Sequence, residues 1–135
     1  MTLTHHELCF GCGTANLFGL QMEIEPADGR PGAVVGRFFV KQDHQGPPGQ
    51  AHGGVLATAL DEAMAMALWS QGIRAATRSL QVELLAPTPI GVFLRVEARV
   101  ESREAGKIWA VASAREVGED ARTVAEARAL FVEPT

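Results

Sequence analysis

Two adjacent carboxylates, Asp61 and Glu62, lie in the middle of an apolar stretch, GGVLATALDEAMAMAL, which runs from Gly53 to Leu68. They are the only charged residues in that stretch. Burying a carboxylate costs several kcal/mol unless it is paired or becomes protonated. The placement therefore indicates a chemical role, as a nucleophile or a general base. The alternative is that both acids face solvent or pair with arginines of a neighbouring strand.

The same stretch predicts the helix that positions these acids. Apolar residues recur at helical spacing from Gly53 to about Gln71, with good helix formers between them. At about 100° per residue, Asp61 lies within about 20° of Gly54 and about 80° of Gly53, whereas Glu62 points about 100° away from Asp61. Only one of the two acids can therefore share the helix face used by Gly54.

The start of this helix is suited to holding a carbonyl oxygen. The first N–H groups of a helix have no partner within it and lie at the positive end of its dipole, and Gly53 and Gly54 leave them open to a ligand. For His52 we favour an orienting role over a chemical one. Helix rise separates Gly53 from Asp61 by about 12 Å, too far for both to contact one carbonyl. If both act on it, they come from two chains, and the sequence predicts a symmetric dimer with two composite sites.

The flanking sequence predicts strands. Apolar and polar residues alternate in segments 20–26, 33–40, 79–87, 92–101, 107–117 and 122–132, whereas 41–50 holds two glycines and two prolines and reads as an irregular loop. Rows of alanine on one face of each of the last two strands would let a bulky element approach. We therefore predict an α+β fold, an antiparallel sheet of about six strands wrapped around one long central helix.

Composition narrows the class of protein. The chain has 135 residues, 47% hydrophobic and 21% charged, with a net charge of -4, which favours a single folded domain over 1–135. It has no basic stripe for nucleic acid, and no window is long and apolar enough to span a bilayer. We therefore expect no nucleic-acid or membrane partner and a cytoplasmic location.

Cys9 and Cys12 are the only cysteines. They are too few for a disulfide framework, and no strand leads into them as in a thioredoxin-like redox pair. A zinc site is the alternative, because His5 and His6 could supply two further ligands. We favour a tight turn around Gly11 and Gly13, with no metal.

Several motifs together resemble one family. HGG is followed by an aspartate nine residues after the histidine (His52, Asp61), and CFGCG and LLAPTPIG occur at the expected places around it. In these features and in its order of elements, nearly the whole chain is similar to the hotdog-fold acyl-CoA thioesterases of the phenylacetate-type (PaaI-like) and 4-hydroxybenzoyl-CoA thioesterase superfamily. The resemblance implies homodimers that often pair into homotetramers, and it implies no metal or other cofactor.

The resemblance also implies roles for individual residues. Asp61 would be the nucleophile or general base, and the N–H of Gly53, supported by Gly54, would polarise the thioester carbonyl from the other subunit. Ser79, eighteen residues after Asp61, would help to position the hydrolytic water, and Thr77 could substitute for it.

One position departs from the family pattern. Some members carry an asparagine six residues before the histidine, where this chain has Gly46. Gln45 or Gln50 could supply an amide to the substrate instead.

We therefore predict hydrolysis of an acyl-CoA thioester to free acid and CoA. A hotdog dehydratase or hydratase fits less well, because its catalytic histidine lies among prolines in a different context. A non-catalytic acyl-CoA or fatty-acid binding module is the alternative from another class, which Gly46 favours mildly and Asp61 opposes.

Overall fold

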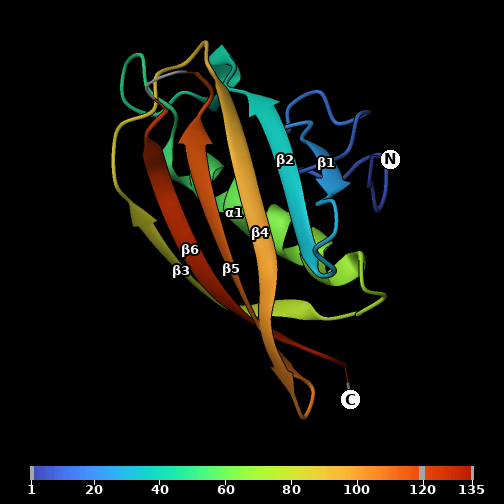
Figure 1. Cartoon of the computed structure of the whole chain (residues 1–135). Coiled ribbons are helices and arrows are strands. Elements are labelled where there is room, and N and C mark those ends of the chain that lie inside the picture. The colour runs from blue at the N-terminus through green and yellow to red at the C-terminus, as the bar shows by residue number, and fades with distance from the viewer. Residues whose placement is uncertain (1, 119–120, 135) are drawn as a thin grey trace.

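The computed structural model describes residues 2–118 and 121–134, which form a six-stranded antiparallel sheet and one long helix (Figure 1). The elements in chain order are β1 (Glu23–Pro26), β2 (Ala33–Phe39), a short 3-10 turn (Gln42–His44), α1 (Gly53–Trp69), β3 (Ala76–Leu84), β4 (Phe93–Glu104), β5 (Lys107–Glu116) and β6 (Thr123–Val132). The strand order across the sheet is β1-β2-β4-β5-β6-β3, with every pairing antiparallel. The predicted fold class is confirmed.

Helix α1 lies along the concave face of the sheet and contacts all six strands. Its apolar residues at helical spacing are buried, including Leu60, Ala63 and Met64 at 0% exposure. The alanine rows predicted from sequence also lie in the core: Ala110, Ala112 and Ala114 on β5, and Ala125, Ala127 and Ala129 on β6. Small side chains there let the sheet and the helix pack closely, since packing distance follows side-chain size.

The ends of several strands differ from the sequence prediction. The first strand begins at Glu23 and not at residue 20, because Gln21 takes a positive φ of 51°. The neighbouring N–H groups of Leu20 and Met22 donate instead to backbone carbonyls of the N-terminal segment. Strand β3 begins at Ala76, three residues before the predicted start. Periodicity alone locates a strand better than it locates its ends.

The two edges of the sheet differ. Beside β1, the N-terminal lead-in, which we define as residues 2–22, adds a further backbone hydrogen bond from Leu3 N–H to Ile24 O at 2.7 Å. At the other edge, β3 pairs with β6 alone among the described strands, and it is exposed along its length except at the half-buried Val82. A nine-residue open edge is a ready template for pairing with another strand.

The loop over 41–50 is irregular as predicted, apart from its single 3-10 turn. Within the described residues, no helix is long and apolar enough to cross a membrane.

Candidate active site

The start of α1 holds one engaged and one free backbone donor. His52 is the N-cap, and its Nδ1 accepts a hydrogen bond from the N–H of Gly54 at 2.9 Å. The His52 N–H donates in turn to His44 O at 2.8 Å. Within the described part of the chain, the Gly53 N–H has no acceptor. Gly53 therefore offers a free donor at the positive end of the helix, while Gly54 has its N–H occupied by the cap.

Gly53 lies against the end of β3. A Cβ added to Gly53 would lie 2.8 Å from Leu84 Cδ1 at the end of β3. The free donor is therefore adjacent to the exposed edge strand, where a second chain or a ligand can approach it.

The two carboxylates have different surroundings. Asp61 is half-buried, and its Oδ1 accepts a hydrogen bond from Thr77 Oγ1 on β3 at 2.7 Å. Glu62 turns toward the N-terminal lead-in, where its side chain is only 12% exposed. The predicted divergence of the two side chains is confirmed, and Asp61 is the acid that faces the edge strand.

The structure brings Thr77 to Asp61 and turns Ser79 away. A bulge lies between them, so that Thr77 is opposite Phe131 and Ser79 is opposite Leu130 on β6. Paired residues share a face of the sheet, and Phe131 is buried in the core beside the helix whereas Leu130 is half-exposed. In a regular strand, residues two apart would share a face. The extra residue of the bulge therefore places Ser79 on the outer face.

The structure distinguishes between the two glutamines that could supply an amide to the substrate. At Gly46, an added Cβ would lie 2.7 Å from His52 Cα, so the backbone as folded leaves no room for a side chain. Gln45 is engaged, because its Oε1 accepts from Gly49 N–H. Gln50 is half-exposed next to the helix start, and in the described residues its side-chain amide makes no hydrogen bond. Gln50 is therefore the amide that is free to reach a ligand.

His44 is a positioning residue that was not predicted from the sequence. It is 1% exposed, its Nδ1 accepts from Lys41 N–H at 3.1 Å, and its Nε2 lies 3.3 Å from Gly19 O. With Nδ1 as acceptor, the ring proton belongs on Nε2, which then donates to that carbonyl. Burial lowers the pKa of His44 below its ordinary value of 6.5 and keeps the ring neutral. His44 thereby ties the loop before α1 to the N-terminal lead-in.

Two hollows on the described part of the chain lie away from these residues. A hollow of about 550 Å³ lies on the outer face of the sheet, and another of about 490 Å³ lies near the turn before β2. Neither is lined by Asp61, Gly53 or Thr77. A ligand of the size of an acyl-CoA would need further walls at this site.

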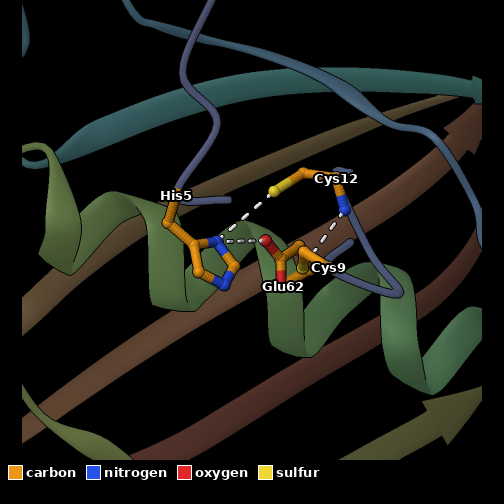
Figure 2. A group of neighbouring side chains, drawn as sticks. All are labelled: His5, Cys9, Cys12 and Glu62. Carbon is orange, nitrogen blue, oxygen red and sulfur yellow. Dashed lines mark hydrogen bonds and ion pairs between the residues drawn. The ribbon is translucent and has the colours of Figure 1, made fainter. Parts of the chain in front are cut away.

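A second group of polar side chains lies on the adjacent face of α1. His5, Cys9 and Cys12 of the lead-in surround Glu62 (Figure 2). This is the one cluster of three or more His, Cys, Asp or Glu ligands found among the described residues that could hold a metal ion. Asp61 takes no part in it.

An antiparallel sheet wrapped around one long helix defines the hotdog fold, the class predicted from the sequence. Residues 48–108 match the thioesterase superfamily. Acyl-coenzyme A thioesterase THEM4 of Xenopus laevis is 34% identical over 89 residues, which cover 65% of this chain and 39% of THEM4. This chain therefore spans well under half the length of that curated relative.

Two solved structures extend the likeness to nearly the whole fold. A thioesterase-like, phenylacetic acid degradation-related protein of Ralstonia eutropha JMP134 is 28% identical, with a TM-score of 0.72 over 84% of this chain and 85% of that one. The PaaI protein of the E. coli phenylacetic acid degradation operon has a TM-score of 0.77 at 24% identity, over 86% of this chain and 81% of that one. The resemblance to PaaI-like hotdog thioesterases is confirmed.

Proposed function

We propose that this protein is an acyl-CoA thioesterase, which hydrolyses an acyl-CoA thioester to a free acid and CoA. The observation that carries the proposal is that one helix holds two groups: a free N–H at its start, and a half-buried carboxylate, Asp61, that faces the exposed edge strand. The match to the thioesterase superfamily and the likeness to THEM4 support the substrate class.

The chemistry follows from these two groups. The thioester carbonyl oxygen accepts a hydrogen bond from Gly53 N–H, which stabilises the negative charge that develops there. Asp61 either removes a proton from a water that attacks the carbonyl carbon or attacks that carbon itself to form an anhydride, which water then opens. In both routes the C–S bond breaks and CoA leaves as a thiolate. Thr77 is a positioning residue, because its hydroxyl holds the Asp61 carboxylate.

The site is composite in this proposal. Gly53 and Asp61 are eight helix residues apart, about 12 Å along one helix. A partner chain that pairs along β3 brings its own Gly53 toward Asp61 and supplies walls for the acyl group. Exposed leucines support this interface: Leu80, Leu84 and Leu85 are 37%, 55% and 52% exposed. Scattered exposed leucines are common, but three next to one open strand edge favour association.

Other predicted residues have supporting roles. His52 orients the helix start as its N-cap, and Gly54 donates to it. Gln50 contacts the substrate through its free amide. Ser79 remains an alternative hydroxyl, to be compared directly with Thr77. A non-catalytic acyl-CoA binding module is the second candidate, favoured by the absence of room for an asparagine side chain at Gly46.

The test is release of free CoA from a panel of short, medium, long and aryl acyl-CoAs. We expect turnover of at least one substrate, and loss of on the order of a hundredfold or more in Asp61→Asn. Glu62→Gln is the neighbouring control and should keep the chemical step, because that carboxylate faces the lead-in. Binding of an acyl-CoA without CoA release by the wild type would support the binding module instead. A monomer in solution would contradict the composite site.

A further inference from the structure

The cluster around Glu62 has the composition and spacing of a metal site. The His5 nitrogen, the two cysteine sulfurs and a Glu62 oxygen all lie within 4.8 Å of one another. His5 Nδ1 is 3.4 Å from Cys12 Sγ and 3.4 Å from Glu62 Oε2 (Figure 2). A ring nitrogen carries either one hydrogen or one lone pair, so it cannot bond to both neighbours at once. Hydrogen bonds among these four side chains therefore do not account for how closely the four atoms are grouped.

The distances fit a tetrahedral ion. Zinc binds sulfur at about 2.3 Å and nitrogen or oxygen at about 2.0–2.2 Å, so neighbouring ligand atoms of a tetrahedral site are about 3.3–3.8 Å apart. The two 3.4 Å separations from His5 Nδ1 lie in that range. The remaining separations are no more than 4.8 Å, so each needs an adjustment of at most about 1 Å.

The surroundings are built to hold these groups in place. The Cys12 N–H donates to Cys9 Sγ at 3.4 Å, a bond that supports a thiolate. The Gly13 N–H donates to Cys9 O at 2.9 Å and closes the turn. At Gly11, an added Cβ would lie 2.5 Å from Glu62 Cγ, so glycine lets the turn approach α1 at this point. The CFGCG sequence thus folds as a compact loop pressed onto the helix.

Glu62 is the observation that points to a ligand. Its Oε2 atom is shielded from solvent and has no hydrogen-bond partner among the described residues. The 3.4 Å approach of His5 Nδ1 is close enough for an ion pair but is not a hydrogen bond. A buried carboxylate oxygen left unpaired is costly, and a cation would remove that cost.

We infer that His5, Cys9, Cys12 and Glu62 form a Zn²⁺ site that fastens the N-terminal lead-in to the middle of α1. Two sulfurs, an imidazole and a carboxylate favour zinc over harder ions such as Mg²⁺ or Ca²⁺. All four positions of the ion are filled by the protein, so the site is structural and not catalytic.

Zinc binding to this cluster releases protons from the two cysteines. Zinc binds cysteine as the thiolate and not as the thiol, so each cysteine gives up its proton on binding. Zinc replaces one proton on each cysteine, and the ion, two thiolates and one carboxylate carry a net charge of about -1. This inference revises the tight-turn interpretation of the two cysteines. It also replaces His6, the second histidine considered from the sequence, with Glu62, which lies fifty residues after Cys12 in the chain.

The test is metal analysis of the untagged protein. We expect about one zinc per chain by mass spectrometry of the metal, and a lower unfolding temperature after treatment with a strong chelator. Replacement by Co²⁺ should give the strong sulfur-to-metal absorption of a thiolate site. A wild type that carries less than on the order of one zinc per ten chains after refolding with Zn²⁺, and shows no such absorption with Co²⁺, would overturn the inference.

Variants identify the ligands. Cys12→Ser and Glu62→Gln should each weaken zinc binding at least about tenfold, whereas His6→Ala, the matched exposed histidine, should leave it unchanged. Full, tight zinc binding by Cys12→Ser or by Glu62→Gln would overturn this ligand set. Should either variant fail to fold, the cobalt spectrum of the wild type decides independently. Asp61→Asn should keep its zinc while losing CoA release, so failure of this inference is distinguishable from failure of the proposed activity.

Discussion

Replacing Gly53 with proline removes the N–H donor proposed to hold the carbonyl oxygen while leaving the fold intact. Gly53 is the first residue of α1, a position where proline is well tolerated because its fixed φ suits the helix and that N–H has no intrahelical acceptor. The residue before a proline must be extended. His52 already is, with φ of -65° and ψ of 138°.

The expected magnitude follows from the role of the donor. Loss of one oxyanion-stabilising donor costs about 2.7–4 kcal/mol, or about 10²–10³ in kcat. The matched control is Gly53→Ala, which keeps the N–H and introduces the same Cβ, 2.8 Å from Leu84 Cδ1. Because that contact is with the end of a flexible side chain, we expect Gly53→Ala to lose much less activity than Gly53→Pro.

The assay is steady-state CoA release, with thermal unfolding and solution mass measured on the same samples. The reasoning predicts a folded Gly53→Pro dimer with KM little changed and kcat at least about a hundredfold lower. If Gly53→Pro is folded and retains activity within a few fold of the wild type, the N–H does not hold the carbonyl. If Gly53→Ala loses as much as Gly53→Pro, crowding at Leu84 and not the donor is responsible.

Two further predictions concern residues that position the site. Thr77→Val removes the 2.7 Å hydrogen bond to Asp61. Because a hydrogen bond to a charged group contributes about 1.5–3 kcal/mol, this change should lower kcat/KM by about 10- to 100-fold. Ser79→Ala should change kcat/KM little, and a larger loss in Ser79→Ala than in Thr77→Val would assign the positioning hydroxyl to Ser79. The fold lowers the pKa of His44 from 6.5 and so holds its ring neutral. Below about pH 6.5 the unfolded chain therefore binds more protons than the folded one. As the pH falls, this group should lower the free energy of unfolding by up to about 1.4 kcal/mol per pH unit. Unfolding measured between pH 7 and pH 5 should show a shallower loss in His44→Gln, and an equal slope in both proteins would refute this role.

Much of the fold could be predicted from local pattern. The helix from Gly53, the two alanine rows and the alternating strands each follow from a repeat of 3.6 or 2 residues in the sequence. The divergence of Asp61 from Glu62 follows from the same helix geometry. These features depend on neighbours in sequence, so periodicity reveals them.

The details that the sequence did not reveal depend on distant contacts. The bulge that separates Thr77 from Ser79 is visible only in the pairing of β3 with β6. The position of Glu62 against Cys9 and Cys12 requires the lead-in to fold back over the helix. His44 has no motif around it, and its role depends on a carbonyl twenty-five residues away. Each of these is a tertiary contact without a local signature.

The central claim, that each active site uses Asp61 from one chain and Gly53 from the other, is tested most directly by mixing two inactive variants. Asp61→Asn and Gly53→Pro chains carrying different affinity tags are coexpressed, and the mixed dimers are isolated through both tags. A composite arrangement gives each mixed dimer one intact site of two, and so about half the wild-type rate of CoA release. Mixed dimers no more active than the two parent variants would show that both residues act within one chain, and would contradict the account.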